Sequence, residues 1–122
     1  MDKTAGQALS DVVSLPSSGV PVDVDDASFD QMVKGSKLPV VVEFWSPNCS
    51  HCKKMAPVVD ALAREFAGRL VVAKVNILEN VVKPEEFGVT GLPAFFLIED
   101  GKAVGKTLGA MPKGQLKKDL GL

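Results

Sequence analysis

Hydrophobic and polar positions along the chain alternate in blocks that predict strands followed by helices. Three runs rich in β-branched and other apolar residues predict strands: 20–24, 39–45 and 70–75. Three amphipathic segments between and after them predict helices: 26–34, 55–66 and 83–87. Because parallel neighbours need a crossover connection, we expect these three strands to be parallel and to be joined by helices.

The C-terminal third predicts a hairpin and one more helix. Two strand-like runs, Ala94–Ile98 and Ala103–Thr107, flank Asp100-Gly101, a dipeptide typical of tight hairpin turns. Residues Pro112–Leu120 then follow an amphipathic helical pattern. Since the hairpin adds an antiparallel element to the parallel strands, we predict an α/β fold: a central mixed five-stranded sheet flanked by four helices.

The first 19 residues do not share this pattern. Serine, proline and glycine interrupt a weakly apolar stretch there. We therefore expect residues 1–19 to be a flexible leader with at most a short helix, and residues 20–122 to form the domain. A chain of 122 residues is the usual size for one domain.

Composition and charge exclude several classes of partner. The 14 basic and 15 acidic residues nearly balance, and no basic stripe predicts a nucleic-acid surface. The apolar runs are far shorter than the roughly 20 residues that span a bilayer, so we expect no membrane partner. The N-terminus lacks the basic start and apolar core of a signal peptide. We expect a cytoplasmic protein, or a periplasmic or secreted one if a signal peptide has been removed.

The two cysteines, Cys49 and Cys52, carry the most specific chemical signal. They stand between a predicted strand and a predicted helix, and a helix N-terminus stabilises a thiolate. Cys52 follows one turn later, near enough to bond to Cys49, as thiol–disulfide exchange requires. One alternative is half of a zinc site, which would need ligands from a second chain because this one has two cysteines and one histidine. The other alternative is an inert pair.

Short motifs surround the cysteines at fixed spacings. They are Val42-Glu43-Phe44-Trp45, Cys49-x-x-Cys52-Lys53, Ala56-Pro57, Ala73-Lys74-Val75-Asn76, Gly91-Leu92-Pro93 and Gly109-Ala110. In this order and spacing the chain resembles the thioredoxin family over about residues 22–121. The resemblance implies a thioredoxin fold and an enzyme that reduces protein disulfides. It also implies no metal and no cofactor beyond the redox-active disulfide. The expected partners are disulfide-containing targets and a thioredoxin reductase or similar electron donor, and the expected state is a monomer.

The resemblance also implies roles for the matched positions. Cys49 would be the nucleophile and Cys52 the resolving cysteine. Pro93 would be the cis-proline of the family, facing the active-site disulfide. The other matched positions would line an apolar surface that binds the substrate: Trp45, Thr90, Gly91, Leu92, Gly109 and Ala110.

Glu43 is the one charged residue within its predicted strand. Burying a carboxylate is costly unless it is paired or protonated. The matched family position holds an acid that acts in proton transfer, and Lys74 matches its usual partner. A buried carboxyl whose pKa lies near neutrality would suit a base for the Cys52 thiol. The alternative is an ordinary glutamate that faces solvent.

The residues around the cysteines depart from the common family pattern. Ser50-His51 replaces Gly-Pro, and Asn48 replaces a tryptophan, which puts standard partner recognition in question. A histidine before the resolving cysteine resembles disulfide isomerases and a periplasmic oxidant, because a protonated ring there stabilises the thiolate and raises the reduction potential. His51 could instead face solvent and have little effect. Two functions therefore remain beside the reductase: a more oxidising disulfide oxidase or isomerase, and a redox-inactive interaction module.

Overall fold

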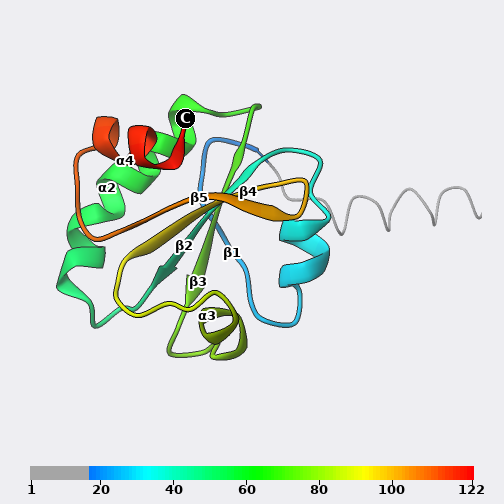
Figure 1. Ribbon diagram of the computed structural model, residues 1–122. Coiled ribbons are helices and arrows are strands. Elements are labelled where there is room, and N and C mark those ends of the chain that lie inside the picture. Colours follow the sequence, from blue (N-terminus) through cyan, green and yellow to red (C-terminus); the bar gives the residue numbers. More distant parts are fainter. Residues whose placement is uncertain (1–16) are drawn as a thin grey trace, which may run out of the picture.

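A twisted sheet with helices on both faces makes up residues 17–122, the part of the chain that the computed structural model describes (Figure 1). The strands are β1 (Val22–Asp23), β2 (Val40–Trp45), β3 (Val71–Asn76), β4 (Ala94–Glu99) and β5 (Lys102–Leu108). The helices are η1 (Asp30–Lys34), which is of π type, α2 (Ser50–Glu65), α3 (Val82–Glu86) and α4 (Lys113–Leu120). This order of strands and helices confirms the one predicted.

The five strands are arranged in the order β1-β3-β2-β4-β5. β1, β3 and β2 are parallel, whereas β4 is antiparallel to β2 and β5 is antiparallel to β4. Asp100 and Gly101 connect β4 to β5 with φ angles of 51° and 80°, the backbone that a tight two-residue hairpin turn requires. The described residues thus confirm the predicted α/β fold with a mixed five-stranded sheet and four helices.

The first helix is shorter than predicted. It was expected over residues 26–34 but is confined to Asp30–Lys34. The Asp26 carboxylate instead accepts backbone N–H groups from Val82 and Lys83, at 3.0 and 2.8 Å, and so binds the start of α3. Residues 26–28 form a turn directly before η1, and the Asp26 bonds connect this turn to α3.

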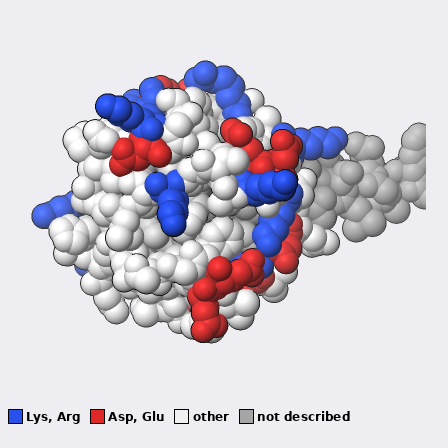
Figure 2. Space-filling view, viewed as in Figure 1, with Lys and Arg blue, Asp and Glu red and all other residues white. Residues whose placement is uncertain are grey.

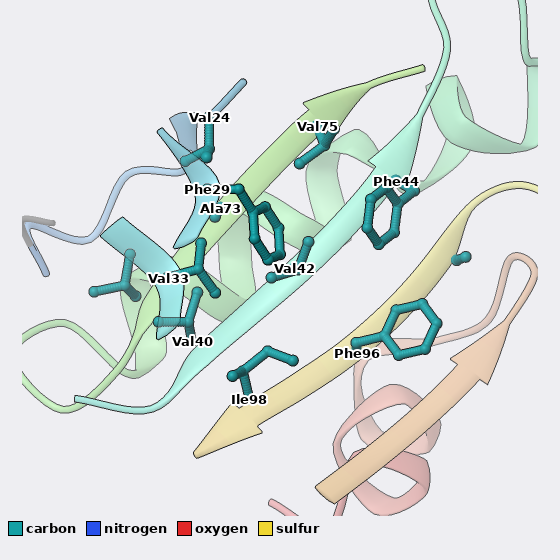
Figure 3. Packing of buried hydrophobic residues seen from close by; sticks show 12 residues of the cluster. Val24, Phe29, Val33, Val40, Val42, Phe44, Ala73, Val75, Phe96 and Ile98 are labelled. Carbon is teal, nitrogen blue, oxygen red and sulfur yellow. The ribbon is translucent and has the colours of Figure 1, made fainter. Parts of the chain in front are cut away.

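One half of the core lies between the sheet and the helices η1 and α3. Alternate residues of β2 point there, and Figure 3 shows Val42 and Phe44 packed with Phe29 near η1 and Phe96 on β4. The Phe44 and Phe96 rings meet edge to face, 5.7 Å apart between centroids. Successive side chains of a strand point to opposite faces of the sheet, so the continuous apolar run that predicted β2 contributes to both halves of the core.

The other half of the core fixes the position of α2. Met55 and Leu62 of α2 and Leu116 of α4 are buried against Val41 and neighbouring residues on the opposite face of the sheet. Both helices lie on this side in Figure 1. Since α2 follows β2 directly, this packing holds the first turn of α2 beside the end of β2.

Residues 1–16 of the predicted leader lie outside the described residues. Residue 17 is attached to the domain, because the Ser17 hydroxyl donates to the Leu70 carbonyl and accepts the Gly68 N–H at 2.7 Å. No helix within residues 17–122 is both long and apolar enough to cross a membrane.

Candidate active site

The cysteine pair lies where the loop after β2 enters α2. Cys49 caps the helix with an extended backbone (φ −97°, ψ 113°), and a disulfide joins it to Cys52 with the Cα atoms 5.2 Å apart. The Cys49 Sγ accepts the backbone N–H of Cys52 at 3.1 Å. This N–H is one of the donors that a helix start leaves without a partner, and together with the helix dipole it favours negative charge on sulfur.

The two sulfurs differ in accessibility. Cys49 is partly exposed, whereas Cys52 is buried, with 5% of its surface exposed. A target disulfide can therefore reach the Cys49 sulfur directly, whereas the buried Cys52 sulfur can react only with a disulfide that Cys49 has already formed. This asymmetry favours Cys49 as the attacking sulfur and Cys52 as the resolving one, as the resemblance implied.

Ser46 shapes the loop before the cysteines and was not singled out from the sequence. Its side chain is buried, and its hydroxyl accepts the Asn48 N–H at 3.1 Å. The Ser46 carbonyl accepts the Cys49 N–H, also at 3.1 Å. A serine at the end of a strand next to Pro47 is a recognisable turn signal, so this positioning role could have been predicted.

Glu43 is buried on the face of β2 that is turned toward α2. Only 2% of its surface is exposed, which excludes the alternative of a solvent-facing glutamate. Burial raises the pKa of Glu43 to about 7, with the Lys74 charge lowering it in part and the Asp60 charge adding to the rise. The Oε1 atom has no hydrogen-bond partner among residues 17–122. The carboxyl can therefore take up or release a proton near neutral pH.

Lys74 is the neighbour of Glu43 across β2 and β3 but is not bonded to it. The register places the two residues side by side, yet the described residues contain no ion pair between them. The Lys74 ammonium lies over the Trp45 ring instead, 4.5 Å from its centroid. Lys74 thus influences Glu43 through its charge at a distance and contacts the aromatic ring directly.

Apart from Trp45, the last residue of β2, the expected substrate-binding residues come from two loops that are bonded to each other. The Leu92–Pro93 peptide bond is cis, as the resemblance implied, and the Pro93 carbonyl accepts the Gly109 N–H at 2.8 Å. The Met111 N–H points at the Met55 Sδ, 3.2 Å away, and so ties the second loop to α2. These contacts connect the loop before β4, the loop after β5 and the helix that carries the cysteines.

The surface around these loops carries little charge. Figure 2, in the view of Figure 1, shows a broad area without charged side chains on the side where α2 begins and the loop before β4 runs. The loops before α2, before β4 and after β5 contribute uncharged residues that are exposed or partly exposed, among them Pro47, Asn48, Thr90, Gly91, Leu92, Gly109 and Ala110. Such a surface suits an unfolded or extended segment of another protein.

His51 lies in the first turn of α2, between the cysteines, and is exposed. It takes part in none of the side-chain hydrogen bonds found within the described part of the chain. No group of three or more His, Cys, Asp or Glu side chains in residues 17–122 is placed to hold a metal ion.

Known proteins are similar to this chain over most of its length. The sequence model of the family described as Thioredoxin matches residues 20–121. The chain is 43% identical to the Thioredoxin of Haemophilus influenzae over 93 residues, which are 76% of this chain and 87% of the relative. It is 44% identical to the Thioredoxin of Pseudomonas aeruginosa over 95 residues, 78% of this chain and 88% of the relative. It is 39% identical to Thioredoxin 1 of Synechococcus elongatus over 101 residues, 83% of this chain and 94% of the relative.

Proposed function

Because the chain belongs to the thioredoxin family of thiol–disulfide oxidoreductases, we propose that it reduces disulfides in target proteins through Cys49 and Cys52. The observation that carries the proposal is the disulfide at the start of α2, with one partly exposed and one buried sulfur. Members of the family need no cofactor, because the cysteine pair itself carries the two electrons.

The first step is attack of the reduced protein on a target disulfide. The Cys49 thiolate bonds to one target sulfur, the target disulfide breaks, and the other target sulfur leaves as a thiolate. The helix N-terminus and the Cys52 N–H favour the thiolate before the attack. The product is a mixed disulfide between the protein and its target.

The second step releases the target. Glu43 accepts the proton of the Cys52 thiol, and the resulting thiolate attacks the Cys49 sulfur. The Cys49–Cys52 disulfide forms, and the second target sulfur leaves. The target has then gained two electrons, and the protein returns to the dithiol with electrons from a thioredoxin reductase or a similar donor. A carboxyl whose pKa is raised to about 7 suits this proton transfer at neutral pH.

Target binding is assigned to the uncharged surface formed by the two bonded loops. An extended target segment would be held by the loop before β4 through Thr90, Gly91, Leu92 and Pro93. The loop after β5 would contribute Gly109 and Ala110. Trp45 is the aromatic residue nearest along the chain to the cysteines, and as the single tryptophan it provides a fluorescence signal of their redox state.

Reduction of insulin with dithiothreitol as electron donor tests the proposal. The wild-type protein should accelerate precipitation of the released insulin chain, and Cys49→Ser should abolish this acceleration. Cys52→Ser should instead accumulate a mixed disulfide that mass spectrometry detects, since attack remains possible and release does not. Ser50→Ala, an exposed change between the two cysteines, is the control and should keep most of the activity. A Cys49→Ser protein as active as the wild type would overturn the proposal.

A more oxidising role is the second candidate, and the observation that favours it is an exposed histidine directly before the resolving cysteine. The reduction potential separates the two roles. The reduction potential of thioredoxin is about −270 mV and that of protein disulfide isomerase is about −180 mV. A value close to the second figure would favour an oxidase or isomerase.

A further inference from the structure

A groove lies on the face of β5 opposite α4. Two adjoining cavities of about 260 and 440 Å³ make it up, and both have Phe87, Phe96 and Lys106 in their walls. On the opposite face β5 lies close against α4, because a Cβ atom on Gly105 would stand 2.6 Å from the Leu120 carbonyl oxygen. The groove face is open by comparison, and Leu108 is 54% exposed on it.

The walls of the groove are mostly apolar and held in place. Phe87 follows α3, and its ring packs edge to face against Phe96, with the centroids 5.0 Å apart. The Phe87 ring also contacts Phe29 and Phe44 in the buried core, at centroid distances of 5.4 and 5.5 Å. The groove is therefore a preformed hollow with aromatic walls, of the kind that takes a large apolar side chain.

The groove is continuous with the surface assigned to target binding. Thr90, which belongs to the loop before Pro93, lines the smaller cavity together with Leu108. The Leu108 methyl carbons lie 3.5 Å from the point where a Cβ on Gly91 would stand. A target segment bound at the Pro93 loop can therefore extend into the groove without leaving the protein surface.

One charge marks the groove. Lys106 is the only charged residue that lines either cavity, and it is exposed. It belongs to none of the ion pairs formed among residues 17–122. An ammonium group without an internal partner at the edge of an apolar hollow complements a carboxylate beside an apolar side chain.

We propose that this groove selects targets in which an acidic–apolar segment flanks the reactive disulfide. This inference rests on the proposed reduction of target disulfides. The apolar side chain packs onto the wall formed by Phe87 and Phe96, beside Leu108, and the adjacent carboxylate meets Lys106. The groove thus adds a specificity surface beyond the residues around the cysteines.

Two disulfide-linked peptides test the proposal: one with Leu-Glu pairs flanking its cysteines and one with Ser-Gly pairs. We expect the wild-type protein to reduce the Leu-Glu peptide faster. Lys106→Glu should slow this peptide about fivefold or more, because it replaces attraction by repulsion, and should change the Ser-Gly peptide less than about twofold. The matched control is Lys102→Glu, an equal charge change on β5 outside both cavities. It should leave the ratio of the two rates unchanged.

A second measurement separates the groove from the chemistry. A fluorescein-labelled Leu-Glu peptide with serine in place of cysteine should bind the wild-type protein in an anisotropy titration and bind Lys106→Glu more weakly. Hydroxyethyl disulfide, a small disulfide without a peptide segment, reports the chemistry alone. If the peptide binds but hydroxyethyl disulfide is not reduced, the groove is confirmed as a binding site and the proposed function fails. If hydroxyethyl disulfide is reduced but the two peptides react equally, the groove proposal fails alone. Equal effects of Lys106→Glu and Lys102→Glu would also overturn it, as would a wild-type dimer that Lys106→Glu dissociates.

Discussion

Replacing Glu43 by glutamine should remove a pH dependence of stability that a single buried carboxyl creates. Glutamine has nearly the same shape and cannot ionise. In the wild-type protein, burial raises the pKa of Glu43 from its ordinary value of 4.5 to about 7. The buried Oε1 atom has no hydrogen-bond partner within residues 17–122, so little stabilises the ionised form.

The sign and size of the effect follow from these two pKa values. As pH rises, the unfolded chain loses this proton near its ordinary pKa of 4.5, whereas the folded protein keeps it until about pH 7. The stabilising contribution is therefore fully present below pH 4.5 and is lost as pH rises through about 7. One pKa unit is about 1.4 kcal/mol, so the free energy of unfolding should fall by about 3 kcal/mol in all. About 2.5 kcal/mol of this should be lost between pH 5 and pH 8.

Urea unfolding of the oxidised protein at pH 5, 6, 7 and 8 measures the effect. The free energy of unfolding of the wild-type protein should fall from pH 5 to pH 8. For Glu43→Gln this fall should be smaller by about 2.5 kcal/mol, so that the variant is more stable than the wild-type protein at pH 8. Glu65→Gln is the matched control. Hydrogen bonds from Lys117 and Lys113 lower the pKa of Glu65 to about 2, so its contribution is lost only at acid pH. Glu65→Gln should keep the wild-type slope. Equal slopes for Glu43→Gln and the wild-type protein would refute the reasoning.

Three further predictions concern the surroundings of this carboxyl. The reduction potential, read from Trp45 fluorescence in glutathione buffers, should lie at roughly −250 to −200 mV. His51→Ala should lower this potential by up to about 30 mV. A wild-type potential below about −270 mV would contradict a histidine that stabilises the thiolate. Lys74→Met should move the pH at which stability falls upward, because the Lys74 charge lowers the pKa of Glu43; an unchanged midpoint in the same urea series would show that this charge has no influence. Ser46→Ala should reduce stability by about 1 kcal/mol, because the Asn48 N–H loses its acceptor. It should also slow insulin reduction, and a fully active variant would exclude a positioning role.

Local patterns in the sequence predicted much of the fold. The β-branched and aromatic run that became β2 has one buried face against each layer of helices, and the Asp100-Gly101 dipeptide has the two positive φ angles of a hairpin turn. The helix start that carries Cys49 was also predicted, because it depends on the change from a strand pattern to a helical one. These features are set by residues that are near one another in the chain.

Features that depend on distant contacts could not be predicted in the same way. Asp26 was expected in the first helix but bonds to the start of α3, more than 50 residues away in the chain. The Met111–Met55 contact has a similar separation. The position of Lys74 over Trp45 was not foreseen either, because the family resemblance had matched Lys74 to the usual partner of Glu43.

The placement of Lys74 bears directly on how the site works. A direct ion pair with Lys74 would hold Glu43 ionised and lower its pKa, which would leave a poor acceptor for the Cys52 proton. With the ammonium over Trp45 instead, desolvation dominates and the pKa of Glu43 stays near 7. An ionised, unpaired carboxyl weakens the fold above this pH, so packing stability alone does not account for a glutamate at this position. The proton transfer proposed for the resolving step does account for it, since that step needs a buried group that is neither permanently charged nor permanently neutral at pH 7.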